Sequence, residues 1–357
     1  MKYTVDKNIK KPAYIQLYEN IRKDITSGVL PFGGRLPSKR LVSEEIGVSI
    51  ITVEHAYSLL IDEGYAVARE RSGYYVSYSA EDGFKHPETA PRLIRPHQQS
   101  QKYDFPFSVY AKTMRKVISD YGEEILLKTD NTGCDELKTA ISEYLLRSRG
   151  ISVSKSRIVI GSGAEYLYGI IIQLLGRDRS YATEDPSYEK IEAVYHANGV
   201  DIQLLKLGSD GILTEELNAT NATVLHITPY RSYPSGITAS ASKRYEYLRW
   251  AGREKIIIED DYESEFSILS KPEETLFAMS NNDNVVYLNT FSKTISPAVR
   301  TGYMVLPEKL LSEFNERVGF YSSSVPTFEQ LVIAEFISSG NFERHINRIR
   351  RKKRREM

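Results

Sequence analysis

Residues 289–300 read Asn-Thr-Phe-Ser-Lys-Thr-Ile-Ser-Pro-Ala-Val-Arg, and their first residue closes the apolar run Val285–Asn289. This run predicts a strand that delivers Lys293 at its end. The amine of Lys293 can form a Schiff base with an aldehyde, and the guanidinium of Arg300 can bind a phosphate through two hydrogen bonds. The layout therefore suits an aldehyde cofactor that carries a phosphate. Ser-Lys pairs are also common on protein surfaces, so this interpretation depends on the sequence around the pair.

Apolar, β-rich runs alternate with helical stretches on both sides of this segment. The predicted strands cover residues 157–160, 201–207, 223–228, 255–259, 285–289 and 301–306, and helices such as 164–175 and 242–251 separate most of them. Such alternation predicts an α/β fold with a mainly parallel sheet. Ligands of such folds bind at the carboxyl ends of the strands.

A glycine-rich turn follows the first of these strands. Gly161-Ser162-Gly163-Ala164 leads from the strand into a helix. The backbone N–H groups at the start of that helix, together with the Ser162 hydroxyl, can hold an anion such as a phosphate. A Gly-Ser-Gly turn without any ligand is the alternative.

A run of acids follows the strand at residues 256–258. Its sequence is Glu259-Asp260-Asp261-Tyr262. A carboxylate at this point can pair with a protonated pyridine nitrogen and keep the ring an acceptor of electrons. The alternative is a solvated loop, which is the state we expect for Asp261 and Glu263.

Three helices are predicted within residues 12–60. Apolar residues at positions 14, 17, 18, 21 and 25 share one face of a helix over residues 12–28. Ser38 is the expected N-cap of a helix that runs to Ile46, and Ser49 is the expected N-cap of the next one. Gly47 makes the tight turn between them. Two short helices joined at a glycine predict a helix-turn-helix.

A hairpin is predicted directly after these helices. The alternating stretches 64–67 and 73–77 have the pattern of two strands, and Arg69 and Arg71 lie between them. Cations at the tip of such a wing are placed to meet phosphates of a nucleic acid.

The run LPSKRLVSEEIGVSIITVEHAYSLLIDEGYAVARERSGYYV, residues 36–76, resembles the GntR-type winged helix-turn-helix. The resemblance implies binding to an operator in double-stranded DNA, with Arg40 reaching the DNA. The residues expected to contact DNA are Ser38, Lys39, Arg40, Ser49, Thr52, His55, Arg69 and Arg71.

The family usually places an arginine after the serine that opens its recognition helix, whereas this chain has Ile50 and Ile51. An apolar pair can touch a thymine methyl but cannot hydrogen-bond a guanine or a phosphate. The alternative is that the pair packs in the core or at a dimer surface.

Three further blocks, residues 184–188, 259–266 and 290–307, resemble the class I aminotransferase fold that binds pyridoxal phosphate. With the DNA-binding region in front, the chain from about residue 12 onward resembles the MocR/GabR subfamily of GntR regulators. The resemblance implies that Lys293 forms the internal aldimine, that Tyr262 bonds the ring hydroxyl and that Tyr188 stacks on the ring. It assigns the pyridine nitrogen to Asp260, because the family's acid stands two residues before the tyrosine. The phosphate is expected to contact Ser162, Gly163, Ala164, Thr290 and Arg300.

The chain departs from the family's pattern at several points. Tyr233 precedes Pro234, where aminotransferases place an asparagine, and Lys128 stands where many relatives have a tyrosine. In the family, the helix that holds the basic run 344–355 continues into a small domain, which supplies an arginine for the carboxylate of the substrate or effector. We expect this chain to lack that domain. The basic run is interpreted as a solvated helix face rather than a nucleic-acid tail.

Length and composition limit the number of domains and the kinds of partner that the chain can have. The 357 residues predict two domains, which we divide into a winged helix-turn-helix at residues 1–78, a linker at 79–103 and an aminotransferase-like domain at 104–357. The 47 acidic and 47 basic residues balance, so DNA binding must come from local patches. The single cysteine excludes an internal disulfide and fits a reducing cytoplasm. We expect no metal, signal peptide or membrane span.

The function expected from these features is transcriptional regulation by a homodimer. Pyridoxal phosphate on Lys293 would sense a small amine or amino acid through its aldimine, and the effector would change the arrangement of the domains. One alternative is a pyridoxal-phosphate-dependent aminotransferase with an accessory DNA-binding domain. The other is a truncated regulator without an effector response. Enzymatic turnover is left open.

Overall fold

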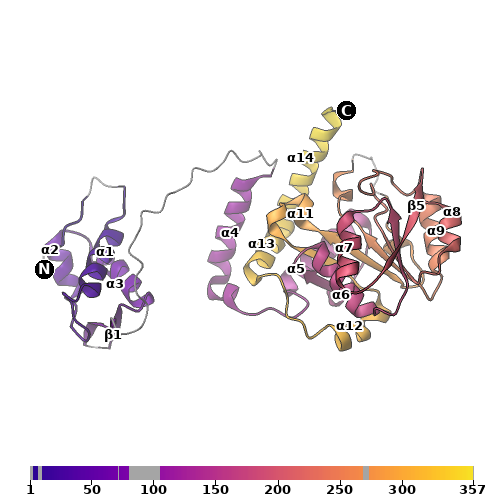
Figure 1. Ribbon diagram of the computed structural model, residues 1–357. Helices are drawn as coiled ribbons and strands as arrows, with labels where there is room; N and C mark the ends of the chain where they lie inside the picture. Colours follow the sequence, from indigo (N-terminus) through magenta and orange to yellow (C-terminus); the bar gives the residue numbers. More distant parts are fainter. Residues whose placement is uncertain (1–2, 7–9, 71, 80–104, 268–272, 357) are drawn as a thin grey trace. The chain divides into compact units, whose positions relative to one another are not determined.

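The computed structural model describes residues 3–6, 10–70, 72–79, 105–267 and 273–356. The chain divides into two units, Met1–Gln99 and Ser100–Met357 (Figure 1). The predicted wing residue Arg71 and all of the predicted linker except Ser79 lie outside the described residues.

The first unit is a winged helix-turn-helix, as predicted. Its elements are α1 (Ala13–Thr26), α2 (Lys39–Ile46), α3 (Ile50–Asp62) and the antiparallel strands β1 (Ala66–Arg69) and β2 (Gly73–Val76). Ser38 and Ser49 cap α2 and α3, because their side chains accept hydrogen bonds from the backbone N–H groups three residues later. Gly47 ends α2 with a left-handed φ of 70°, which glycine adopts without strain. The helices pack through a core that includes Leu17, which is completely buried.

An eight-stranded, mainly parallel sheet forms the centre of the second unit. In spatial order the strands are β3 (Ile158–Gly161), β10 (Gly302–Val305), β9 (Val285–Thr290), β8 (Ile256–Asp260), β7 (Val224–Ile227), β4 (Tyr181–Asp185), β5 (Ile202–Gly208) and β6 (Gly211–Ile212). The strands from β9 to β5 run parallel, while β10 is antiparallel to β3 and β9, and β6 is antiparallel to β5. This confirms the α/β fold class.

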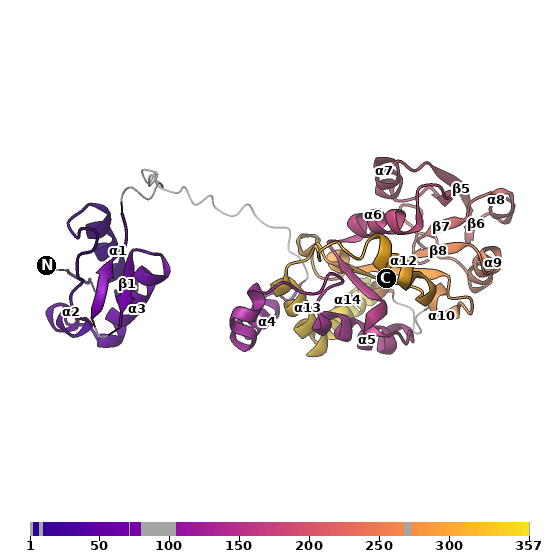
Figure 2. The same cartoon turned by 90° about the horizontal axis from the view of Figure 1, so that it is seen from below.

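Helices cover both faces of this sheet (Figure 2). Residues such as Ile258, Leu288 and Met304 pack with α6 (Ala164–Leu175), α7 (Glu189–Ala197) and α12 (Leu311–Arg317). Their neighbours in sequence, including Tyr287 and Tyr303, point to the opposite face, because side chains alternate along a strand. The helices that pack there or at the sheet's end are α4 (Phe107–Tyr121), α5 (Asp135–Arg149), α8 (Thr214–Ala219), α9 (Ala241–Ala251), α10 (Leu276–Met279), α13 (Thr327–Ser338) and α14 (Asn341–Glu356).

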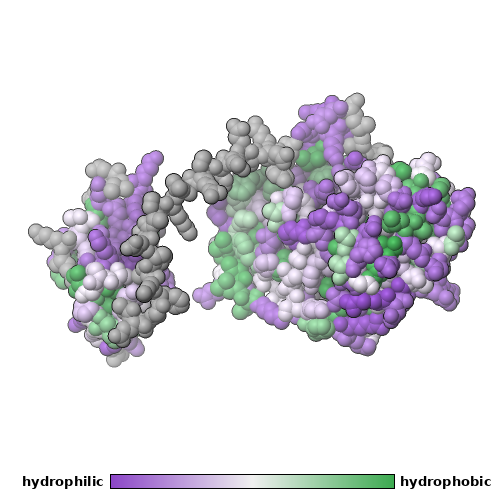
Figure 3. Space-filling view, in the orientation of Figure 1, coloured by the Kyte–Doolittle hydropathy of each residue, from purple (hydrophilic) through white to green (hydrophobic). Residues whose placement is uncertain are grey.

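The basic run predicted as a solvated helix face forms most of α14. This helix buries Phe342, His345 and Ile346, while most of its arginines and lysines are exposed. Figure 3 shows hydrophilic residues gathered over its end. Among the described residues, no helix combines the length and the apolar character needed to cross a membrane.

Candidate cofactor and DNA sites

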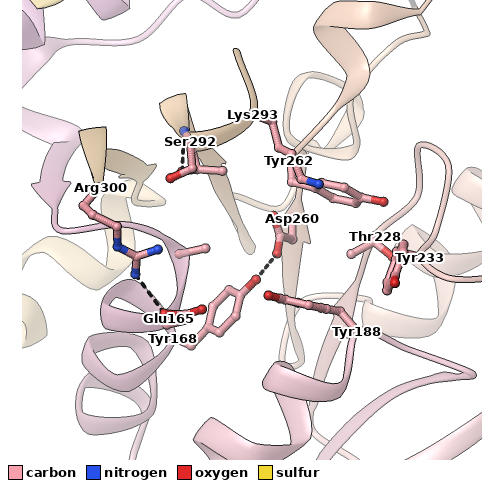
Figure 4. Close-up of a pocket in the computed structure, with 12 residues that line it drawn as sticks. Glu165, Tyr168, Tyr188, Thr228, Tyr233, Asp260, Tyr262, Ser292, Lys293 and Arg300 are labelled. Atoms are coloured by element: carbon pink, nitrogen blue, oxygen red, sulfur yellow. Dashed lines mark hydrogen bonds and ion pairs between the residues drawn. The ribbon is translucent and has the colours of Figure 1, made fainter. Parts of the chain in front are cut away.

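A cavity of about 260 Å³ lies where β8 and β9 end (Figure 4). It is lined by Ala164, Glu165, Tyr168, Tyr188, Thr228, Tyr233, Asp260, Tyr262, Thr290, Ser292, Lys293 and Arg300. All the residues predicted to bind a cofactor are in this set, except Ser162 and Gly163. The strands deliver these side chains to one edge because parallel neighbours end on the same side.

Asp260 presents a buried carboxylate to this cavity. The residue is the last of β8 and only 2% exposed. Its Oδ2 accepts a hydrogen bond from the hydroxyl of Tyr168. Burial, and then the charge of Asp260, raise the pKa of Tyr168 well above its ordinary value, so this hydroxyl keeps the proton that it donates. Oδ1 has no hydrogen-bond partner among the described residues. A buried oxygen without a donor is rare in folded proteins, so this atom fits a protonated pyridine nitrogen of a bound ligand.

The two acids beside Asp260 point away from the cavity. Glu259 accepts hydrogen bonds from the Tyr230 hydroxyl at 2.6 Å and from the backbone N–H of Leu276 at 2.7 Å. Asp261 is completely buried, where it pairs with Arg149 and accepts a hydrogen bond from Tyr287. The expectation that Asp261 is solvated is therefore wrong. The strand continues two residues past its apolar run, to Asp260, and the alternation of side chains turns Asp261 into the core.

The start of α6 and the guanidinium of Arg300 lie next to each other at the cavity. Gly163 has a φ of +95°, and a Cβ at this residue would lie 3.2 Å from Nη2 of Arg300. Any other residue would be strained at this φ and would push the guanidinium away from the turn by a few tenths of an ångström. Nη2 of Arg300 also pairs with Oε2 of Glu165 at 2.8 Å. The backbone N–H of Ser162 is bonded to Oγ of Ser324 at 3.0 Å, outside the cavity lining.

Lys293 lies in α11 (Phe291–Thr294), the short helix that follows β9. Thr290 caps this helix, since its hydroxyl accepts a hydrogen bond from the backbone N–H of Ser292 at 3.2 Å. The Lys293 side chain is exposed to the cavity and has no hydrogen bond or ion pair with any other described residue. Its amine is therefore open to a carbonyl compound that enters the cavity.

Besides Tyr168, the cavity is lined by the tyrosines Tyr188, Tyr233 and Tyr262. The rings of Tyr188 and Tyr233 meet edge to face with their centres 5.9 Å apart. The Tyr262 hydroxyl donates a hydrogen bond to the backbone oxygen of Arg231 at 2.9 Å, so its proton is directed away from the cavity. Its oxygen can still accept a hydrogen bond from a ligand.

Sequence reasoning missed part of the lining, namely Glu165, Tyr168, Thr228 and Ser292. One available signal was helix spacing. Tyr168 stands four residues after the predicted phosphate residue Ala164, and residues four apart share a helix face. Tyr233 was singled out only as a departure from the aminotransferase pattern, and it lines the cavity as well.

The residues predicted to contact DNA differ in their exposure and in their contacts with other side chains. The Arg40 side chain is 84% exposed and its Nε lies 3.7 Å from Glu44. Lys39 pairs with Glu54 at 2.6 Å, and the Arg69 guanidinium lies over the Tyr75 ring, 4.5 Å from its centre. The other described residues of this set have local roles or are exposed: Ser38 and Ser49 are N-caps, Thr52 contacts Ser49, and His55 is exposed beside Tyr14.

Ile50 and Ile51 open the second helix of the helix-turn-helix and remain exposed. Ile50 is 48% exposed and Ile51 is 62% exposed. The alternative that this pair packs in the core is therefore wrong. An apolar pair on the first turn of such a helix is available to an outside partner.

Both units match known protein families. Residues 13–76 match the gntR family of bacterial regulatory proteins, and residues 99–357 match aminotransferase class I and II. The uncharacterized HTH-type transcriptional regulator YdeL of Bacillus subtilis (strain 168) is 33% identical over 98% of this chain and 79% of its own length. The chain belongs to the MocR/GabR subfamily of GntR regulators. The probable rhizopine catabolism regulatory protein MocR of Rhizobium meliloti is 28% identical over 97% of this chain and 76% of its own.

The second unit of this MocR-type regulator also resembles solved aminotransferases. The kynurenine aminotransferase of Pyrococcus horikoshii superposes with a TM-score of 0.62 and 23% identity. The match covers 71% of this chain and 66% of that enzyme, so this chain spans just under two thirds of its length. This likeness establishes the fold of the unit. The subfamily's architecture, a DNA-binding domain joined to an aminotransferase-like domain, is therefore present in this chain.

Proposed function

We propose that this MocR-type regulator binds pyridoxal phosphate in the cavity around Lys293 and senses a small amine or amino acid there. The observation that carries the proposal is the pairing of an unbonded Lys293 amine with the unpartnered Oδ1 of Asp260 in one cavity. Lys293 would bind the carbonyl carbon, Asp260 the ring nitrogen and Arg300 the phosphate. When bound, the cofactor supplies an electrophilic carbon that reacts reversibly with amines.

An amine effector would act by exchange. Its nitrogen would replace that of Lys293 on the carbonyl carbon and leave the Lys293 amine free. Such an exchange changes DNA binding only if the effector has different affinities for the two states of the protein. The test is a gel shift on DNA selected by the protein from a random library, with pyridoxal phosphate present and a panel of amines and amino acids added. A panel that leaves every shift unchanged contradicts the sensing proposal.

Catalysis by the same site is the second candidate function. The identity of Tyr233 argues against it, because aminotransferases place an asparagine there on the ring hydroxyl, and Tyr233 is 54% exposed instead. The discriminating measurement is turnover of an amino donor with a keto acid by purified protein. Sustained turnover would favour an aminotransferase with an accessory DNA-binding domain.

Replacing Arg300 with glutamine is expected to weaken pyridoxal phosphate binding roughly ten- to hundredfold, since a charge-assisted hydrogen bond contributes roughly 1.5–3 kcal/mol. The affinity for pyridoxal, which lacks the phosphate, should change little. Titrations of both ligands by absorbance measure the two dissociation constants. Equal weakening for both ligands would contradict a phosphate contact at Arg300.

Assembly as a homodimer in the cytoplasm is part of the proposal. It is supported by the apolar surface over α4, visible in Figure 3, where Phe107 is 73% exposed and Ile118 is 52% exposed. Leu126 and Leu127 extend this surface past the end of the helix. Patches of this kind mark protein interfaces. Sedimentation of the full chain should give twice the monomer mass, and Phe107→Asp should shift the equilibrium toward the monomer.

The exposed pair Ile50 and Ile51 is expected to read thymine methyl groups. Replacing dT by dU in the selected DNA removes these methyls without changing any hydrogen bond, and should weaken binding by a few-fold for each contacted base. The Ile50→Ala/Ile51→Ala variant should lose this difference between dT and dU, because it lacks the contacting side chains. A variant that still discriminates dT from dU would assign the methyl contact to other residues.

A further inference from the structure

Asp260 packs against a small group of buried polar side chains, of which Tyr168 also lines the cavity. Tyr168 is 2% exposed, and His226 and Tyr195 are completely buried. The Tyr168 hydroxyl bonds Oδ2 of Asp260, and its ring meets the His226 ring edge to face at 4.8 Å. Figure 4 shows the Tyr168 hydroxyl directed at Asp260 from α6.

His226 lies near Asp260 but makes no hydrogen bond with it. Its Nε2 is 3.7 Å from Oδ2 of Asp260, beyond hydrogen-bonding distance, and has no hydrogen-bond partner among the described residues. Its Nδ1 is 3.1 Å from the Tyr195 hydroxyl. Burial raises the pKa of Tyr195 well above its ordinary value, so this hydroxyl keeps its proton and can donate it to Nδ1. In that arrangement the Nε2 proton faces Asp260 without reaching it.

Asp260 therefore has two ways to satisfy its carboxylate. With Oδ2 bonded to Tyr168, Oδ1 remains free for a ligand in the cavity. Without a donor at Oδ2, a small movement of the carboxylate would bring it into hydrogen-bonding distance of Nε2 of His226. Such a movement would satisfy a buried charge at the expense of the ligand contact, because an unpaired buried carboxylate is costly.

We propose that Tyr168 is a positioning residue that holds Asp260 with Oδ1 toward the ring nitrogen of the cofactor. The inference rests on the proposed cofactor site, and it adds the residue that orients Asp260 toward the ring nitrogen. Tyr168 touches Asp260 and acts through it.

The test uses Tyr168→Phe in the full chain and two ligands. One is pyridoxal phosphate, and the other is its 1-deaza analogue, in which carbon replaces the ring nitrogen. The wild-type protein should prefer pyridoxal phosphate, because only that ligand can bond Oδ1 of Asp260. Tyr168→Phe should reduce this preference about tenfold while leaving the affinity for the deaza analogue within about twofold, as expected for loss of a hydrogen bond to a charged group.

A matched control is Tyr181→Phe. Tyr181 belongs to the same core as Tyr168 and is completely buried, but its hydroxyl bonds the backbone oxygen of Gly176 at 2.7 Å. This variant should keep the wild-type preference. If Tyr168→Phe lowers the affinity for both ligands by the same factor, or changes neither affinity, Tyr168 has no positioning role. A wild-type protein that binds neither ligand would instead overturn the cofactor site itself, and the positioning role with it.

Discussion

Lys293→Ala is expected to abolish covalent attachment of pyridoxal phosphate to the protein. Lys293 supplies the one amine of the cavity lining, and it has no competing hydrogen bond or ion pair among the described residues. Without this amine, Asp260 and Arg300 can still bind the ring nitrogen and the phosphate, so weaker, non-covalent binding should remain. The measurement is borohydride reduction followed by intact-mass spectrometry. The wild-type protein should gain the mass of one reduced cofactor per chain, and the variant should gain none.

Lys190→Ala provides the matched control for this experiment. Lys190 is half-exposed and pairs at 2.6 Å with Glu165, which lines the same cavity, but Lys190 itself does not. This variant should be labelled like the wild type, because its amine does not face the cavity. Labelling that persists in Lys293→Ala and disappears in Lys190→Ala would move the attachment point to α7 and contradict the proposed site.

Much of the fold could be predicted because its strands are buried and apolar. The runs that became β3, β7, β8, β9 and β10 contain several β-branched or large apolar residues in succession, which is typical of strands covered on both faces. Strands β4 and β6 were not predicted. β4 reads Tyr-Ala-Thr-Glu-Asp, and its two acids interrupt the apolar pattern expected of a buried strand. Glu184 is nevertheless buried, because the hydroxyls of Thr228 and Ser232 donate to its Oε2. Partners so distant in sequence leave no local signal.

The candidate site, like the fold, was predictable where a residue has a local sequence signal and not where its role depends on a distant contact. Lys293, Asp260 and Arg300 could be found because each stands at a fixed offset from a strand end or a motif. Tyr168 could not be assigned a partner, since its contact with Asp260 joins residues 92 positions apart. Asp261 was misread because sequence alone does not tell where β8 ends, and one further residue of strand decides which carboxylate faces the cavity.

The second large effect is expected from Arg40→Ala, which should weaken DNA binding by roughly one and a half to four orders of magnitude. Arg40 lies on the first turn of α2, and its guanidinium pairs with no described residue other than Glu44, at 3.7 Å. The guanidinium can therefore reach a phosphate or a base edge without breaking a strong contact. One such contact contributes roughly 1–3 kcal/mol, and a homodimer on two half-sites would lose it twice. Fluorescence anisotropy on the selected DNA, repeated over a range of salt concentrations, measures the loss.

The salt dependence identifies the kind of contact that Arg40 makes. A phosphate contact should lower the slope of log affinity against log salt by about one for each subunit, whereas a base contact should mainly relax sequence preference. Lys23→Ala is the control, because Lys23 is an exposed cation on α1, outside the helix-turn-helix, and should leave both quantities unchanged. If Arg40→Ala binds as tightly as the wild type at every salt concentration, then α2 does not approach the DNA at this residue. The contact would then have to come from the wing, where Arg69 is exposed.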